Sequence, residues 1–291
     1  MTLLELVQSC SARLDEAGVS FGHGTTCAFD EAAWLVLWSL GLPLDDLDTV
    51  EQRLLTQAEL QRARSLIDRR ITERVPAAYL TGEAWLQGVP FHVDARSIVP
   101  RSLIAEVLAD GLIDHWMGHE PARVLDLCTG NGSLAVLAAM AWPQAAVDAS
   151  DLSDEALAVA RLNLQRHSLD GRIRLLQGDA LAPCPGPYDL VLCNPPYVNR
   201  ASMAALPAEY RAEPALALDG GDDGMDFIGP LLRALPRVMA PKGWLVLEIG
   251  HERTHFERAF ADLQPVWLPT ALGEDQVLML PAQALGAGVA R

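Results

Sequence analysis

From residue 122 onward the chain alternates short apolar runs with stretches that have a helical pattern. The apolar runs at residues 124–127, 146–150, 172–176 and 188–193 are predicted strands, and a helix is predicted over residues 134–142. Strands that alternate with helices form a parallel sheet covered on both faces. This part of the chain is therefore predicted to have an α/β fold.

A glycine loop follows the first of these strands, where residues 128–133 read CTGNGS. Its G-x-G spacing, without a third glycine in step, differs from the dinucleotide fingerprint. Asp151 ends the second strand, 21 residues after Gly130, where an acid can bind both hydroxyls of a ribose. Ser153 begins the next predicted helix, and Asp179 follows the third strand. The loop by itself indicates a nucleotide of some kind, and its alternative is a tight turn without a ligand.

The fourth strand runs directly into Asn194, Pro195, Pro196 and Tyr197. Two prolines at a strand end interrupt the ladder and make the turn rigid. An amide or aromatic amine nitrogen is a poor nucleophile because its lone pair is delocalised. The Asn194 side-chain oxygen and the Pro195 carbonyl can accept its two N–H groups and hold the lone pair toward an electrophile, while the Tyr197 ring packs against the flat amide. This pattern favours chemistry on a planar nitrogen over a merely proline-stiffened turn.

The first 75 residues are predicted to form a small helical domain. Asp30 is predicted to cap a helix over residues 31–40, and Thr56 and Glu59 have capping-box spacing before another. Residues 76–100 are predicted to be a hairpin linker with its turn near residues 87–88. Ser102 is predicted to cap a helix that reaches about residue 115, at the start of a third region, residues 101–291.

The charge of the chain argues against general nucleic-acid binding. There are 22 Lys and Arg against 38 Asp and Glu, a formal net charge of −16. Such a field repels phosphate backbones and suits a basic partner, although many acidic proteins are acidic only for solubility. The five cysteines include no C-x-x-C, so neither a disulfide framework nor a structural zinc site is predicted. No signal peptide or membrane span is predicted, and a cytoplasmic location is expected.

Together these residues resemble the Rossmann-like S-adenosylmethionine-dependent methyltransferases. The N-P-P-Y motif is shared by adenine-N6 nucleic-acid methyltransferases and protein glutamine N(5)-methyltransferases. Three further runs resemble the glutamine group: its linker, its insert after N-P-P-Y and its fifth strand. They are residues 79–82 (YLTG) with 99–102 (VPRS), residues 206–214 with 217–218 and 220–224, and residues 248–250 within a predicted strand over 243–250.

Within this group, Pro100, Arg101 and Ser102 resemble the branch that methylates large-ribosomal-subunit protein three, as do residues 21–25 (FGHGT). Members that act on release factors usually carry a P-R-P-E-T-E type run instead. The chain departs from the branch at Leu103, commonly proline, and at Asn131, commonly serine, and neither departure touches the chemistry.

The resemblance implies a function and a set of site residues. The expected reaction is methyl transfer from S-adenosylmethionine to a glutamine side-chain amide of a basic ribosomal protein. Asp151 is expected to hold the ribose, Asp179 to face the adenine amine, and Asp126 to support the loop and approach the methionine amino group. The implied catalytic residues are Asn194, Pro195 and Tyr197, and the implied cofactor-binding residues are Asp126, Thr129, Gly130, Gly132, Asp151, Asp179 and Asn194.

Alternative functions and motifs are also open to test. Release factors as acceptors, adenine methylation of nucleic acid, and a non-catalytic ribosome assembly factor are the rival functions. The run HERTH at residues 251–255 matches the H-E-x-x-H zinc pattern, but it directly follows a strand and would start a helix, so no metal site is predicted. Residues 219–226 lack the EF-hand spacing and are interpreted as a surface loop.

Overall fold

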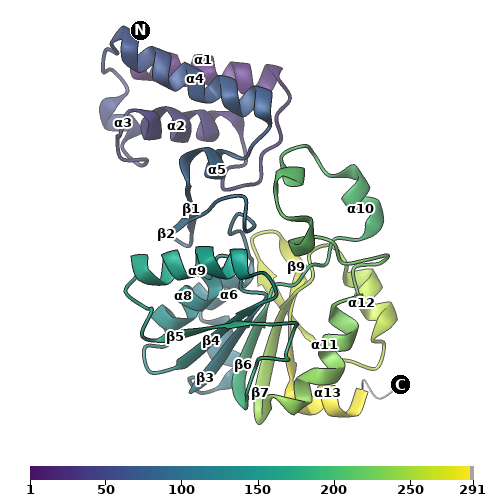
Figure 1. Ribbon diagram of the computed structural model, residues 1–291. Helices are drawn as coiled ribbons and strands as arrows, with labels where there is room; N and C mark the ends of the chain where they lie inside the picture. Colours follow the sequence, from purple (N-terminus) through teal and green to yellow (C-terminus); the bar gives the residue numbers. More distant parts are fainter. Residues whose placement is uncertain (289–291) are drawn as a thin grey trace.

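A seven-stranded sheet forms the centre of the larger part of the molecule, and the computed structural model describes residues 1–288 (Figure 1). The strand order is β5-β4-β3-β6-β7-β9-β8. Neighbours from β5 to β7 pair in parallel, whereas β9 is antiparallel to both β7 and β8. The strands are β3 (Arg123–Leu127), β4 (Ala146–Asp151), β5 (Ile173–Gln177), β6 (Tyr188–Cys193), β7 (Met239–Glu248), β8 (Val266–Thr270) and β9 (Gly273–Pro281). The predicted parallel α/β sheet is confirmed, with an antiparallel edge added by the last two strands.

Helices cover both faces of this sheet because side chains along each strand alternate between two cores. Val124 and Leu190 belong to one buried cluster, and their neighbours Leu125 and Val191 belong to the other. The first face carries α6 (Ile104–Ala109), α7 (Leu112–Met117), α8 (Ser133–Ala141) and α9 (Asp154–Arg166). The second carries α11 (Ile228–Ala234), α12 (Arg253–Ala259) and α13 (Ala282–Gly288).

The strand register brings the predicted site residues to one edge. Leu127 at the end of β3 lies opposite Ser150 of β4 on one side and Cys193 of β6 on the other. The residues that follow these three, Cys128, Asp151 and Asn194, therefore emerge side by side. This is the switch point of the sheet, because the chain passes from β3 outward to β4 on one side and from β6 outward to β7 on the other. Open α/β sheets bind ligands at such points.

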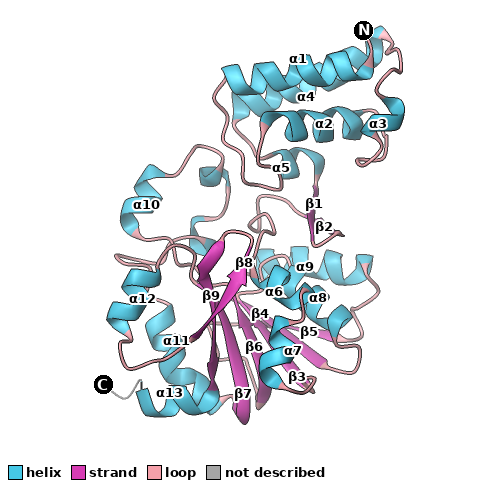
Figure 2. Cartoon of the chain, turned by 180° about the vertical axis from the view of Figure 1, so that it is seen from behind, coloured by secondary structure: helices cyan, strands magenta, loops and turns pink. Residues whose placement is uncertain are grey.

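The N-terminal helices pack around a core of their own (Figure 2). They are α1 (Leu3–Glu16), α2 (Ala28–Ser39), α3 (Leu47–Val50), α4 (Gln57–Glu73) and the short α5 (Ala77–Thr81). The predicted capping box is confirmed: Glu59 N donates to Thr56 Oγ1 at 3.3 Å, and Thr56 N donates to Glu59 Oε2 at 2.9 Å. The side chains of Leu60, Ala63 and Ile67 then lie buried on one face of α4.

The predicted hairpin is also confirmed, as β1 (Glu83–Leu86) and β2 (Val89–His92). Gln87 and Gly88 both have positive φ, 49° and 73°, as a two-residue hairpin turn requires. Asn163 of α9 ties the hairpin to the sheet domain. It accepts a hydrogen bond from His92 N at 2.7 Å and donates one to His92 O at 3.0 Å.

Three predicted elements differ from the structure. Asp30 does not cap α2, which begins at Ala28; the acid stands in the first turn, where the helix dipole also favours it. The predicted helix after Ser102 is broken into α6 and α7, because Gly111 adopts φ 68° between them. The strand predicted over residues 243–250 is β7, which starts earlier, at Met239, because Met239 pairs with Tyr188.

No helix among residues 1–288 is long and apolar enough to cross a lipid bilayer.

Candidate active site

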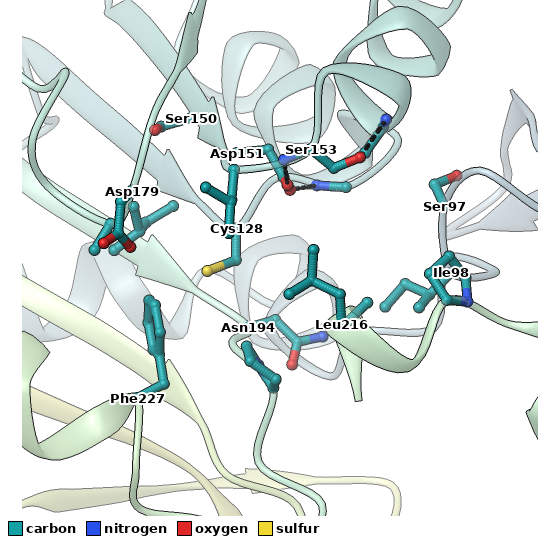
Figure 3. Close-up of a pocket in the computed structure, with 18 of the residues that line it drawn as sticks. Ser97, Ile98, Cys128, Ser150, Asp151, Ser153, Asp179, Asn194, Leu216 and Phe227 are labelled. Carbon is teal, nitrogen blue, oxygen red and sulfur yellow. Dashed lines mark hydrogen bonds between the residues drawn. The ribbon is translucent and has the colours of Figure 1, made fainter. Parts of the chain in front are cut away.

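A cavity lies at the carboxyl ends of β3, β4, β5 and β6 (Figure 3). Two other segments close its sides, the end of the linker and the insert that follows α10 (Arg200–Ala205). Its lining comprises Arg96, Ser97, Ile98, Leu127, Cys128, Gly130, Ser150, Asp151, Leu152, Ser153, Ala156, Gly178, Asp179, Ala180, Asn194, Pro196, Pro214, Leu216, Ala217 and Phe227. Four of the residues predicted for the site therefore share one cavity: Gly130, Asp151, Asp179 and Asn194.

Asp126 supports the glycine loop from beneath and is completely buried. Its Oδ2 accepts hydrogen bonds from Thr129 Oγ1 and from Ala135 N, the latter at 2.9 Å. Its Oδ1 has no hydrogen-bond partner among the described residues. Burial raises the pKa of Asp126 to about 7, although the bonds from Thr129 and Ala135 oppose this shift. Asp126 and Thr129 thus form the floor of the loop, and Asp126 Oδ1 is buried beneath it without a partner among the described residues.

The two glycines of the loop have different local roles. Gly130 has φ 56°, and a Cβ there would meet no atom within 4 Å, so the space above it is open. Gly132 has φ 81°, and its Cβ would lie 3.1 Å from Ala160 Cβ. Gly130 therefore leaves room at the cavity, whereas Gly132 allows α8 to begin close against α9.

Asp151 lies at the tip of β4 with both oxygens already engaged by backbone N–H groups (Figure 3). Gly130 N donates to Oδ2 and Ser153 N donates to Oδ1, each at 2.9 Å. Burial raises the pKa of Asp151, and these hydrogen bonds oppose the rise. Since each carboxylate oxygen has two lone pairs, both can still accept a hydroxyl. Asp179 follows β5 and is exposed. It lies near Phe227, at the end of the cavity away from Ser97 and Ile98 (Figure 3).

The N-P-P-Y turn leaves β6 directly at this cavity. Asn194 lines it with no hydrogen bond from its side chain to any described residue, so both its oxygen and its amide group are free for a ligand (Figure 3). Pro195 is buried, and Pro196 forms part of the wall. The structure thus presents an amide acceptor on a rigid turn, next to the open space above Gly130.

Tyr197 does not line this cavity; it is held on the other side of the turn. Its hydroxyl donates to Glu248 Oε1 at 3.1 Å, and burial raises its pKa well above the usual value. A Cβ at Gly250 would lie 2.5 Å from the Tyr197 ring, and a Cβ at Gly220 would lie 2.6 Å from Tyr197 Cα. A Cβ at Gly224 would lie 2.3 Å from Tyr197 O. Glycine is therefore required where these backbones touch the tyrosine.

This packing corrects the interpretation of residues 219–226 as a plain surface loop. Asp219, Asp222 and Asp226 are exposed, as expected for a surface, but Gly220 and Gly224 are buried. Gly220 N also donates to Val198 O at 2.9 Å. The loop therefore supports the backbone just after the N-P-P-Y turn.

Glu248 lies in one of the family-like runs, and nothing in the sequence indicates a role for its side chain. The carboxylate is buried at the end of β7 and accepts three hydrogen bonds. Ser102 Oγ and Leu103 N donate to Oε2 at 2.6 and 2.9 Å, and Tyr197 donates to Oε1. Burial raises the pKa of Glu248, and these bonds oppose it. The only sequence signal was an acid at the end of an apolar strand.

The H-E-x-x-H run straddles the start of α12, as its position after a strand predicts. His251 precedes the helix, and His255 Nδ1 lies 2.6 Å from Glu252 Oε2. In the part of the chain that the structure describes, no group of three His, Cys, Asp or Glu is arranged to hold a metal ion.

The cavity fits S-adenosylmethionine on several counts. Asp126 does not line the cavity, but its unpartnered Oδ1 beneath the loop is an acceptor that an ammonium group would satisfy. The open space above Gly130 gives a ligand access to backbone. Asp151 has acceptor capacity for ribose hydroxyls. The remaining walls are largely apolar, with Leu152 and Phe227 available to the faces of a purine.

Comparison with known proteins agrees with this assignment. The Methyltransferase small domain model matches residues 105–210, and the PrmC N-terminal domain model matches residues 5–82. A methyltransferase structure from Pyrococcus furiosus shares the fold, with a TM-score of 0.50, 16% identity, and coverage of 76% of this chain and 98% of its own.

Curated relatives cover nearly the whole chain. The ribosomal protein uL3 glutamine methyltransferase of Bordetella pertussis is 54% identical, over 98% of this chain and 96% of its own length. The protein of the same name from Neisseria meningitidis serogroup B is 43% identical, over 98% and 94%. The prediction of an S-adenosylmethionine-dependent methyltransferase is confirmed, and the chain belongs to the family of ribosomal protein uL3 glutamine methyltransferases.

Proposed function

We propose that this enzyme methylates the side-chain amide nitrogen of a glutamine in ribosomal protein uL3. The observation that carries the proposal is the placement of Asn194, on a proline-stiffened turn, in the cavity that fits the cofactor. The names of relatives that match almost the full chain support uL3 as the acceptor.

S-adenosylmethionine, when bound, supplies an electrophilic methyl group. The side chains described above would hold it as follows: Asp126 at the amino group, Asp151 at the ribose and Asp179 at the adenine amine. Thr129 and Gly130 shape the loop between them, and Gly132 acts indirectly by setting the start of α8.

The N-P-P-Y turn prepares the acceptor nitrogen. Asn194 Oδ1 and the Pro195 carbonyl accept the two amide hydrogens and direct the lone pair into the cavity. These contacts strengthen as positive charge develops on the nitrogen, so they stabilise the transition state more than the bound acceptor. No strong base is needed beforehand, because the methylated nitrogen loses its proton easily.

The three regions of the chain divide the work in this proposal. Residues 1–75 select the acceptor, residues 76–100 connect, and residues 101–291 bind the cofactor and carry the chemistry. The net charge of −16 favours encounter with a basic ribosomal protein, and a ribosomal acceptor places the reaction in the cytoplasm.

The test is intact-mass analysis of purified uL3 after incubation with enzyme and isotopically labelled cofactor, followed by peptide mapping. The expected result is one added methyl group on a glutamine. Purified release factors and an adenine-containing DNA duplex serve as competing acceptors. Transfer to either of these and not to uL3 would contradict the proposal, and so would the absence of turnover with all of them.

A further inference from the structure

Glu213 lies in the insert, immediately before the cavity-lining Pro214, and its side chain is fully buried. Its Oε1 accepts hydrogen bonds from Val99 N at 2.9 Å and Arg101 Nη1 at 2.6 Å. Its Oε2 accepts one from Arg101 Nη2 at 2.7 Å. Contact with His23 and the charge of Arg101 outweigh burial and lower the pKa of Glu213 to about 2. The group is therefore a carboxylate at any physiological pH.

These contacts join the two sides of the active-site cavity. Val99 directly follows Ile98, which lines the cavity from the linker, while Pro214 lines it from the insert. The insert also carries Leu216, which lines the same cavity and is 57% exposed. A single carboxylate thus fixes the distance between the linker wall and the insert wall of the cavity.

The helical domain contacts the same point through residues 21–25. His23 is buried, its Nε2 lies 3.5 Å from Glu213 Oε2, and its ring packs on Tyr210 with centroids 4.3 Å apart. A Cβ at Gly22 would lie 2.3 Å from Tyr210 Oη, so this loop is shaped to fit the insert. Arg101 also stacks over Tyr210, 5.4 Å from the ring centroid.

A second buried carboxylate in the insert, Glu209, extends the contact between insert and helical domain. Its Oε1 accepts hydrogen bonds from Ser20 N, Arg70 Nη1 and Arg74 Nη1, each at 3.1 Å. Figures 1 and 2 show that the insert after α10 extends from the sheet toward the N-terminal helical domain. The insert is thereby anchored to the helical domain at two places, through Glu209 and through Glu213.

We propose that Glu213 is a positioning residue for the acceptor: with His23 and Arg101 it locks the helical domain, the linker and the insert into one wall of the acceptor entrance. This inference rests on the proposed function for its catalytic consequence. It assigns the FGHGT run at residues 21–25 to holding the insert in place, and not to direct contact with the acceptor.

The test compares Glu213→Gln with its more conservative partner Glu213→Asp, with His23→Gln, and with Asp222→Asn as the matched control. Asp222 is an exposed acid near the same insert whose ion pair is with the exposed Arg200. Glu213→Gln removes the counter-charge of Arg101 and turns an amide group toward that cation. We expect kcat on intact uL3 to fall about 10²-fold, because small misplacements near reacting groups have costs of this order.

Three further readouts separate positioning from chemistry or unfolding. Calorimetric binding of S-adenosylhomocysteine should stay close to that of the parent, because Val99, Arg101 and His23, the groups that Glu213 contacts, do not line the cavity. Amide hydrogen exchange at Val99 should become faster in Glu213→Gln and His23→Gln, and unchanged in Asp222→Asn. Glu213→Asp should recover part of the rate.

Parent-like kcat together with parent-like exchange at Val99 in Glu213→Gln would overturn the inference. If that variant fails to fold, parent-like values in both Glu213→Asp and His23→Gln would do the same. Failure of the proposed function has a different signature: the parent enzyme itself would not methylate uL3, while the exchange at Val99 would still report whether Glu213 holds the wall.

Discussion

Tyr197 donates its hydroxyl hydrogen to Glu248 across 3.1 Å, which ties the end of the N-P-P-Y turn to the end of the neighbouring strand β7. The same carboxylate holds Ser102 and Leu103 at the start of the sheet domain. The turn, the strand and the start of the sheet domain are therefore mutually fixed.

Tyr197→Phe should lower stability more than activity. The change leaves Glu248 Oε1 buried without a partner, which costs about 1–3 kcal/mol, while the ring keeps its packing on Gly250. Tyr188→Phe is the control, because Tyr188 donates to Asp148 Oδ2 at 2.7 Å at the far end of β6, and that oxygen keeps a hydrogen bond from Arg174 at 2.8 Å. Chemical denaturation should show a larger stability loss in Tyr197→Phe than in Tyr188→Phe, and methyl-transfer rates should be mostly retained in both. Near-complete loss of rate in Tyr197→Phe with unchanged stability would place the hydroxyl in the chemistry.

Asn194→Ala should lower the catalytic rate by about 10²–10³ and change cofactor affinity little, because its contact belongs mainly to the transition state. Asn194→Asp keeps an acceptor oxygen of similar size and should retain some activity. Single-turnover rates and titrations with S-adenosylhomocysteine measure both effects. An alanine variant near the parent rate would mean that the turn is only structural.

Asp151→Ala should weaken cofactor binding while the fold persists. Lost hydrogen bonds to a charged acceptor contribute about 1.5–3 kcal/mol each, and the variant also releases Gly130 N from its partner. Calorimetry with S-adenosylhomocysteine gives the dissociation constant. The exposed Asp154, which starts α9, provides the control Asp154→Ala, with no change expected. An unchanged dissociation constant in Asp151→Ala would remove this residue from the ribose site.

Cofactor affinity should rise with pH through the pKa of Asp126, which is about 7. A cation bound at Oδ1 stabilises the carboxylate, so binding releases a proton below that pKa and affinity gains up to about tenfold per pH unit there. In the absence of ligand, the free energy of unfolding changes with pH in the opposite direction and falls as pH rises. The folded protein holds the proton more tightly than the unfolded chain, so this group destabilises the fold as pH rises from its ordinary 3.8 to about 7. Titrations at several pH values should show the slope in the parent and none in Asp126→Asn.

A chain that begins at residue 78 should bind cofactor but lose activity on intact uL3. The helical domain has its own buried core, separate from the two cores of the sheet. Its removal takes away Arg70 and Arg74, the partners of Glu209. Calorimetry and the methylation assay measure the two properties, and full activity of the truncated chain would refute acceptor selection by residues 1–75.

Local signals in the sequence predicted much of the fold. The capping box at Thr56, the N-cap at Ser153 and the turn at Gln87 each depend on neighbouring residues and are present in the structure. Asp30 was misassigned because an acid suits both the N-cap and the first turn of a helix. The break at Gly111 was missed because an isolated glycine is also tolerated within a helix.

That Gly130, Asp151, Asp179 and Asn194 meet at one cavity follows from the order of the strands, since parallel strands end at one edge of a sheet. The buried ion pairs of Glu209 and Glu213 could not be found in this way. Their partners lie more than a hundred positions away along the chain, and charged residues in a loop ordinarily indicate exposure. Only the three-dimensional structure shows that these acids are buried.

The backbone of the loop at residues 219–226 supports Tyr197 through glycines, while most of its aspartates face solvent. The two kinds of position should accept change very differently. A fluorophore or spin label at Asp222 would stand two residues from Gly220, whose backbone contacts Tyr197 and Val198, yet leave that support untouched. That makes this position a natural attachment point for following, in real time, the arrival of a protein acceptor at the enzyme.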